Sequence, residues 1–412
     1  MTVEPPNAQP VQAGSSRART VLIVAIALLL ALLIGLVIVF YNLLKPAGLP
    51  ETAGGGEDAL TWVRSMYGFG PAADEQLFAP ISVAIAPNGD VWAADQTRAR
   101  IMVFRSDGTF KRLIHTGGGG TAKGQFQRPE SLAFDADGNA WIADTQAGKI
   151  IALTQDGRFI RELPAEAQAR GVAVDGDKVY MLDLGKVIVF DRNTGKKITS
   201  WGVRGAAPGQ IDAYQGIVAK DGIVYVADSF NKRLQAFQDD GKLLWVVPEG
   251  SATREGPGSR KGTGSDSSAS EAVPDHRWDL PQDLVFDARG RLVVIDAFQF
   301  ELAAVDPKTG KVQAKYGDFG TADGQFFYPT SIAYDPARDW FAVADTQNNR
   351  IQIVRIPNSG GGAGSGVWRA LSSPYRYLAI PLGLLLIAIA LAVWAVWRMM
   401  RKNRAAETPL AE

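Results

Sequence analysis

The octapeptide ADTQNNRI at residues 344–351 belongs to a repeat that runs through most of this 412-residue chain. It follows a short apolar run and places an acidic residue, Asp345, five positions before a basic one, Arg350. The acidic residue returns in every unit, and a basic residue follows it at this interval in four of them. The recurring acids are Asp95, Asp144, Asp183, Asp228, Asp296 and Asp345. Such periodicity predicts an array of similar supersecondary units.

Paired glycine turns set the number of strands in each unit. The pairs are Gly89 and Gly108, Gly138 and Gly157, Gly176 and Gly195, Gly222 and Gly241, and Gly290 and Gly310. Each turn lies between short apolar or β-branched runs, so each unit contains two tight hairpins and four short antiparallel strands. The chain is therefore predicted to be all-β, a six-bladed β-propeller of four-stranded antiparallel blades.

The repeat resembles the NHL repeat. The resemblance rests on residues 344–351 and on the lead-in GTADGQF at residues 320–326, which is followed by Pro329. It covers about residues 60–356. An NHL unit is one propeller blade, so the resemblance implies the same fold as the turns. It also implies a likeness to the NHL sensor propellers of some bacterial receptor kinases, although the cytoplasmic parts expected here are too short for a kinase domain.

The sixth unit stops after its third strand, at residues 351–354. Residues 60–68, LTWVRSMYG, resemble the closing strands of other units, and we expect them to supply the missing fourth strand. This pairing would remove an open sheet edge. Linkers are expected at residues 45–59 and 357–376, and a flexible Gly/Ser-rich insertion at residues 250–275, between the fourth and fifth blades.

Two apolar runs flank the repeats. Residues 21–40 and 378–397 are each 20 residues long, which at ~1.5 Å per residue reaches the ~30 Å of a bilayer core. The first run is longer than a signal-peptide core and has no convincing cleavage site, which favours an uncleaved anchor. We therefore expect single transmembrane helices at residues 21–44 and 377–397.

Basic residues set the expected orientation of these helices. Arg17 and Arg19 precede the first helix, and only Lys45 closely follows it. The second helix is followed by Arg398, Arg401, Lys402 and Arg404. The positive-inside rule then places the tails 1–20 and 398–412 in the cytoplasm. The propeller would lie on the extracytoplasmic side of the cytoplasmic membrane.

The first apolar run also offers a surface for association. Ala27, Ala31 and Gly35 form a stripe of small residues on one helix face. Such stripes let membrane helices approach closely, which predicts a helix-mediated oligomer, although alanine is also simply common in membrane helices.

The composition excludes several functional classes. Lys plus Arg equals Asp plus Glu at 43 each, so no basic excess indicates a nucleic-acid partner. The chain has no cysteine, which excludes disulfides, thiolate metal sites and cysteine nucleophiles. Its two histidines, His115 and His276, cannot make a three-histidine metal site in one chain. We expect no cofactor.

Function should lie where the blades differ, because a residue shared by most blades more often holds them together. The six recurring acids are therefore interpreted as structural carboxylates that accept hydrogen bonds from turn amides. The residues after the usual first-strand proline vary, and they predict a polar channel mouth. The candidates for this mouth are Glu130, Arg170, Gln215, Gln282 and Asp283.

The channel mouth leaves two interpretations. The favoured one is a water-filled channel without a ligand. The alternative is a metal-dependent hydrolase or lyase that uses the central channel, as the resemblance to propeller lactonases and peptide-amidating lyases would imply. Those enzymes gather several metal ligands on the axis, whereas Glu130 and Asp283 are the only obvious acids near it here.

Blade topology predicts which face is free to bind. Both linkers should leave from the face that carries the hairpin turns, so the opposite face, which carries the blade-to-blade connections, should look away from the membrane. That connection face has Phe230, Phe298 and Phe300 where the sixth blade has Gln347 and Asn349. Exposed aromatic residues often mark partner sites.

The leading hypothesis is a membrane-tethered extracytoplasmic binding or scaffold propeller without catalysis of its own. Its partner would be an unidentified extracytoplasmic or membrane protein, docked over blades four and five.

Overall fold

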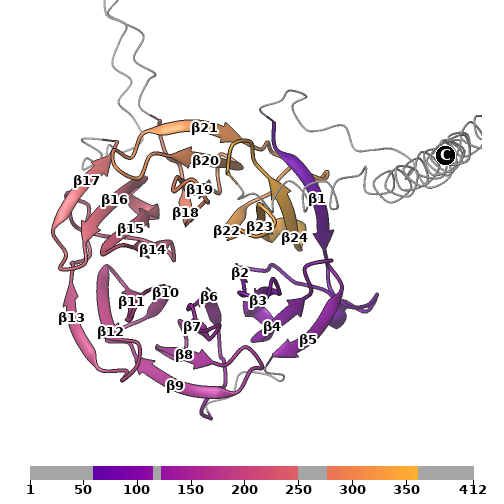
Figure 1. The fold of residues 1–412 in the computed structure, drawn as a ribbon, viewed down its shortest axis with the longest axis horizontal. Helices are drawn as coiled ribbons and strands as arrows, with labels where there is room; N and C mark the ends of the chain where they lie inside the picture. Colours follow the sequence, from indigo (N-terminus) through magenta and orange to yellow (C-terminus); the bar gives the residue numbers. More distant parts are fainter. Residues whose placement is uncertain (1–58, 115–121, 249–275, 361–412) are drawn as a thin grey trace, which may run out of the picture. The chain divides into compact units, whose positions relative to one another are not determined.

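The computed structural model describes residues 59–114, 122–248 and 276–360, all within the compact unit Pro50–Gly366. They form six four-stranded antiparallel sheets, arranged as blades around a central axis (Figure 1). The predicted all-β six-bladed propeller is confirmed. Across these described ranges, no helix is both long and apolar enough to cross a bilayer. The spans predicted at 21–44 and 377–397 lie outside them, as do both tails and the insertion 250–275.

The first five blades take four consecutive strands each, from the axis outward (Figure 1). Blades one to three are β2 (Ser82–Ile85), β3 (Val91–Asp95), β4 (Arg100–Phe104) and β5 (Phe110–Ile114); β6 (Pro129–Phe134), β7 (Ala140–Asp144), β8 (Lys149–Leu153) and β9 (Phe159–Pro164); and β10 (Ala169–Asp175), β11 (Lys178–Asp183), β12 (Lys186–Asp191) and β13 (Lys197–Trp201). Blades four and five are β14 (Ile217–Lys220), β15 (Ile223–Asp228), β16 (Arg233–Gln238) and β17 (Leu243–Val247); and β18 (Pro281–Phe286), β19 (Leu292–Asp296), β20 (Glu301–Val305) and β21 (Val312–Tyr316).

Blade six contains both the first and the last described strand. Its strands are β22 (Pro329–Asp335), β23 (Trp340–Asp345), β24 (Arg350–Arg355) and β1 (Thr61–Met66). β1 pairs antiparallel with β24, with Thr61 opposite Arg355 and Met66 opposite Ile351. The predicted closure of the last blade by the N-terminal strand is confirmed, and it removes an open edge.

Short 3-10 helices lie in several turns and connections. They are η1 (Ala73–Glu75), η2 (Gln96–Arg98), η3 (Ser229–Asn231) and η4 (Thr346–Asn348). The last three join the second strand of a blade to its third. The turn lies beside the start of the first strand, because Pro329 of β22 pairs with Asp345 of β23. These turns and the blade-to-blade connections therefore share one face, the connection face.

The hairpin turns occupy the opposite face, the hairpin face. In the turn between β18 and β19, Asp287 Oδ1 accepts hydrogen bonds from the backbone amides of Arg289 and Arg291, both at 2.9 Å. Gly290 has φ 77°, a left-handed conformation that glycine adopts without steric cost. Asp287 and the glycine three residues later, Gly290, therefore fix the conformation of this turn locally.

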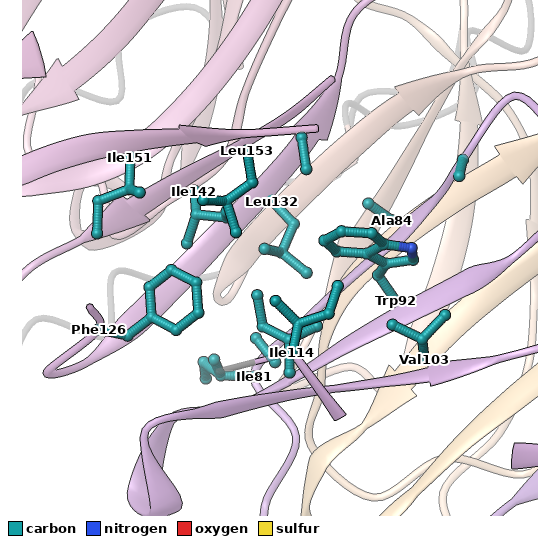
Figure 2. Packing of buried hydrophobic residues seen from close by; sticks show 14 residues of the cluster. Ile81, Ala84, Trp92, Val103, Ile114, Phe126, Leu132, Ile142, Ile151 and Leu153 are labelled. Atoms are coloured by element: carbon teal, nitrogen blue, oxygen red, sulfur yellow. The ribbon is translucent and has the colours of Figure 1, made fainter. Parts of the chain in front are cut away.

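The core is divided among the blade boundaries. Between blades one and two, Trp92 and Val103 pack with Phe126, Ile142 and Ile151, all fully buried (Figure 2). Phe126 comes from the Gly-Gln-Phe lead-in that precedes blade two. The equivalent apolar residues Ile211, Trp278 and Phe326 are buried between later pairs of blades. Each of these four side chains thus packs between two blades, and burying one large side chain stabilises the folded state by about 1.5–3 kcal/mol.

Candidate functional site

The recurring acids hold the blades together, as predicted. All six are buried. Asp345 Oδ1 accepts from the Phe327 amide at 2.8 Å, and its Oδ2 accepts from Arg350 Nε at 2.8 Å and Gln352 Nε2 at 2.9 Å. Burial raises the pKa of Asp345, although these hydrogen bonds act in the opposite direction. Because the carboxylate is used in joining a lead-in to a strand, it is not available for chemistry.

A ring of short polar side chains joins neighbouring inner strands at the axis. Its bonds run from the Leu132 amide to Ser82 Oγ (3.2 Å), from the Val172 amide to Ser131 Oγ (3.2 Å), from the Ile332 amide to Asp283 Oδ2 (3.1 Å) and from the Val83 amide to Ser331 Oγ (3.1 Å). In blades three and four the equivalent position of the inner strand is a glycine. A Cβ on Gly171 would lie 2.2 Å from the Gln215 carbonyl oxygen, and a Cβ on Gly216 would lie 2.5 Å from the Gln282 carbonyl oxygen. These blades approach too closely for a side chain.

Asp283 is therefore a member of this ring rather than a free acid at the mouth. Ser331 Oγ donates to its Oδ2 at 2.7 Å, and the Leu284 amide donates to its Oδ1 at 2.9 Å. Burial raises the pKa of Asp283 to about 6, and the hydrogen bonds to its carboxylate offset only part of that effect.

The other mouth candidates close the channel instead of lining an open one. Glu130, Gln215 and Gln282 are 1%, 2% and 3% exposed. Gln215 Nε2 donates to the carbonyl oxygens of Thr330 at 2.8 Å and Ile81 at 3.3 Å. These bonds reach from blade four to blades six and one, so the amide crosses the axis. The sequence predicted a polar channel mouth at these residues and did not predict this contact across the axis.

Glu130 and Arg170 are engaged with their neighbours. Thr145 Oγ1 donates to Glu130 Oε2. The Arg170 guanidinium lies 5.6 Å from the ring centroid of Tyr214 and donates to Gln168 Oε1 at 2.9 Å. Burial, reinforced by the nearby Glu130 carboxylate, raises the pKa of Tyr214. Both Glu130 and Arg170 are therefore held by neighbouring side chains.

Metal ligands are not gathered in the part of the chain that the structure describes. No group of three or more His, Cys, Asp or Glu side chains there could hold a metal ion. His276 lies beside blade five, with its Nε2 3.4 Å from Glu301 Oε1. Burial lowers the pKa of His276 to about 4, so the ring is neutral at physiological pH. His115 lies outside the described residues.

Exposed aromatic side chains give a second candidate site, on the connection face. Phe298, Phe319 and Phe327 are 56%, 59% and 37% exposed. Ring centroids are 4.8 Å apart for Phe300 and Phe319, 5.3 Å for Phe319 and Phe327, and 5.6 Å for Phe298 and Tyr328. We call these five residues the aromatic patch. Two come from the turn between β19 and β20, and three from the connection between β21 and β22.

Two residues of the aromatic patch have a strained backbone. Phe300 has φ 56° and Tyr328 has φ 57°. A left-handed conformation costs a bulky residue about 1–2 kcal/mol. Blades two and six place Gly148 and Asn349, residues that tolerate this conformation better, at the position of Phe300. Ala99 in blade one and Lys232 in blade four are also left-handed at the position of Phe300, so this conformation belongs to the repeated turn, and the aromatic patch is a candidate because its rings are exposed and grouped.

The grouping differs from the one expected over blades four and five. Phe298 and Phe300 contact the connection into blade six, whereas Phe230 contacts Tyr214, with ring centroids 6.4 Å apart. Sequence reasoning missed the other members of the aromatic patch. The signal was present: the lead-in GQFQRP at residues 124–129 becomes GQFFYP at residues 324–329, where two aromatic residues replace polar ones.

Structures with a similar fold are known from Bacteroides. A Bacteroides thetaiotaomicron protein of unknown function has 17% identity and a TM-score of 0.53, over 72% of this chain and 75% of that chain. An auxiliary nutrient binding protein from Bacteroides ovatus has 17% identity and a TM-score of 0.52, over 72% of this chain and 76% of that chain. At this identity the likeness shows the fold alone.

Among curated proteins, no match to this chain is found. Residues 130–360 match the protein-family model described as outer membrane protein assembly factor BamB. This match covers more than half of the 412 residues, and the chain therefore belongs to that family.

Proposed function

We propose that this chain is a membrane-tethered extracytoplasmic scaffold, without catalysis of its own, whose aromatic patch binds a protein partner. The observation that carries the proposal is the aromatic patch, where exposed rings contact one another. Contiguous exposed apolar surface marks interaction sites, and aromatic residues dominate their binding energy. The description of the family, an assembly factor, agrees with a scaffold role.

A protein surface suits the aromatic patch better than a small ligand. Small ligands bind in concave sites that enclose most of their surface. Here the rings of Phe298 and Phe319 stand more than half exposed on surface turns. Two exposed polar residues, Asp318 and Thr321, lie beside Phe319 in the connection between β21 and β22. An aromatic centre with a polar rim is the usual anatomy of a protein–protein interface.

The proposed membrane tether rests on the sequence, and the position of the residues after β24 agrees with it. The apolar runs at residues 21–40 and 378–397 are the proposed anchors, the basic flanks place both tails in the cytoplasm, and the repeat motifs favour NHL-type blades. After β24, Ser359 Oγ donates to Asp339 Oδ1 at 2.5 Å, and Asp339 lies in a turn on the hairpin face. Tethering from this face would leave the aromatic patch directed away from the membrane.

The test uses the absence of cysteine in the chain. Thr321→Cys in the full chain adds a single exposed thiol beside Phe319, which can carry a short photo-cross-linker in native membranes. We expect one dominant protein adduct, which disappears when Phe298→Gln and Phe319→Ser are added. Ile198→Ser, which removes an exposed apolar side chain from β13 in blade three, should leave the adduct unchanged. An adduct that survives the double substitution would refute the proposal.

A further inference from the structure

One position of the lead-in is aromatic in blades one and six, which are neighbours in the closed ring. It lies two residues before the first-strand proline, as Phe327 lies before Pro329. In blade one this residue is Phe78, which is 49% exposed. In the other four blades its amide donates to the recurring acid, as the Phe327 amide does, and its side chain is polar. These polar residues are Gln127, Glu166, Asp212 and Asp279.

The turn after β23 connects the two aromatic lead-ins. Its Gln347 amide donates to the Phe327 carbonyl at 3.1 Å. On its other side, Asn349 Oδ1 accepts from the amide of Ala79, the residue after Phe78, at 2.7 Å. The apolar surface of the aromatic patch therefore continues past this exposed polar turn to blade one. We call the aromatic patch together with Phe78 the extended surface.

Exposed acids lie beside the extended surface in blades six and one. Asp318 directly precedes Phe319. Asp74 lies in η1, where the carbonyl of the preceding residue accepts from Arg98 Nη2 at 2.8 Å. The Arg98 guanidinium carbon in turn lies 5.1 Å from the ring centroid of Phe78. Neither acid forms an ion pair with another of the described residues.

The basic side chains of the same region form internal contacts. Arg98 Nη1 donates to the buried Asp95 carboxylate at 3.2 Å, and Arg350 Nε donates to the buried Asp345 carboxylate at 2.8 Å. Arg277 is exposed, but it lies beside the turn of blade five. Over blades six and one, the exposed charge next to the aromatic rings is therefore negative.

We infer that the extended surface binds a protein segment in which basic residues alternate with bulky apolar side chains, with the basic residues over blades six and one. The inference rests on the proposed function and names the chemistry of the partner. Apolar side chains would cover the exposed rings, while basic ones would pair with Asp318 and Asp74. Such charge complementarity gives an interface its specificity. A second copy of this chain in a symmetric contact would instead bring the same acids together.

The test measures peptide binding to the full chain in nanodiscs of phosphatidylcholine, which has no net charge to attract a basic probe. A fluorophore is placed on Thr321→Cys beside Phe319, or on Ala73→Cys beside Asp74. One probe is a peptide of repeated Phe-Lys-Gly-Lys units, and the other has Glu in place of Lys. We expect several-fold tighter binding of the lysine peptide at both labels. High salt should reduce this difference, because it screens exposed charges.

Matched variants separate these two acids from general charge. Asp74→Asn with Asp318→Asn should remove most of the preference for lysine. Asp156→Asn with Asp240→Asn removes two exposed acids from hairpin turns of blades two and four, and should leave the preference unchanged.

Phe78→Gln tests whether the extended surface reaches blade one. It introduces the residue that blade two has at this position, and should weaken binding of the lysine peptide several-fold. The two asparagine pairs change only exposed side chains, so they decide the question even where Phe78→Gln lowers the melting temperature.

Four results would overturn the inference. They are equal affinity for the two peptides, an equal effect of both asparagine pairs, unchanged binding in Phe78→Gln, and self-association of the chain without peptide that Phe319→Ser abolishes. The last result would assign this face to a second copy. If the Thr321→Cys adduct still depends on Phe298 and Phe319, the partner site remains and only the inferred chemistry fails. An adduct that survives those two substitutions would instead contradict the proposed function.

Discussion

Blade six has Arg350 five residues after its recurring acid, whereas blade five has Glu301 at that position. Arg350 Nε donates to Asp345 at 2.8 Å, and its Nη2 donates to the Ala322 carbonyl at 2.8 Å, so one side chain joins a strand to the lead-in of its blade. Glu301 instead lies 3.1 Å from Lys315 Nζ, and the sequence before blade five has no Gly-Gln lead-in.

The acid itself does the same task in both blades. Asp296 accepts from the backbone amides of Asp279 at 2.7 Å and Leu280 at 3.0 Å, and no basic side chain among the described residues forms an ion pair with it. Blade five then departs from blade six at other positions, with Asp283 in place of Ser331 and Phe298 in place of Gln347. The comparison teaches that shared positions hold a blade together, while the positions that differ contain the candidate sites.

The largest expected effect is the loss of a buried arginine from blade six. Arg350→Ala leaves Asp345 buried without its cation, and breaking such a pair costs about 3–5 kcal/mol of unfolding free energy. Glu301→Gln in blade five should change that free energy by less than about 1 kcal/mol, or raise it, because burial raises the pKa of Glu301 and disfavours its charge. Urea unfolding followed by tryptophan fluorescence measures both.

Arg233→Ala in blade four is the matched control for this prediction. Arg233 Nε donates to Asp228 at 2.7 Å, and both side chains are fully buried. The loss should therefore be as large as for Arg350→Ala. Equal effects of the Arg350 and Glu301 substitutions would contradict the distinction between the two blades.

The second effect is a pH dependence that belongs to blade five. The folded pKa of Asp283 is raised to about 6, so the folded chain binds this proton more tightly than the unfolded chain. Its stabilising contribution is complete below about pH 4 and is lost as the pH rises through about 6. Unfolding free energy should therefore rise by about 1.3 kcal/mol between pH 7 and pH 5, because one pH unit below the folded pKa corresponds to about 1.4 kcal/mol.

Asp283→Ser, which introduces the residue of blade six, tests this pH dependence. It keeps a hydroxyl in the ring of axis hydrogen bonds but cannot titrate. Comparing the unfolding free energy of both chains over pH 5 to 7, at about one pH unit per step, isolates the contribution of Asp283. Parallel curves for the two chains would show that another group titrates.

Exchanging the residues at the left-handed position gives an effect of similar size. Asn349→Phe in blade six should cost about 2 kcal/mol, because it adds backbone strain and removes the 2.7 Å hydrogen bond from the Ala79 amide. Phe300→Asn in blade five should change stability by less than about 1 kcal/mol, since relief of strain offsets the lost ring contacts. Thermal melting of the two variants measures these changes in stability. A large loss of stability for Phe300→Asn would show that the Phe300 ring is a packing residue.

The smallest expected effect on stability is that of Phe298→Gln. The ring is more than half exposed, so its replacement should change the unfolding free energy by no more than about 0.5 kcal/mol. The Thr321→Cys adduct should nevertheless weaken. If Phe298→Gln destabilises the protein and leaves the adduct undiminished, Phe298 is a packing residue of blade five and not part of a binding site.

The sequence by itself determined the repeat and its closure. Glycine turns and alternating apolar runs act locally, so their spacing was enough to predict four strands per blade and the role of the six acids. The missing fourth strand of the last unit was also enough to predict that β1 pairs with β24. These features depend on contacts between neighbours in the chain or on a repeated pattern, and both can be read along the sequence.

Only the tertiary structure decided which side chains from different blades meet. Gln215 crosses the axis to Thr330, Phe300 meets Phe319, and Arg64 meets Trp340. The repeat pattern says which strand a residue occupies, but not how far the blades twist or how closely the inner strands approach. Those quantities follow from the packing of the whole ring, because each blade boundary must fit the ones on either side before the last blade can close.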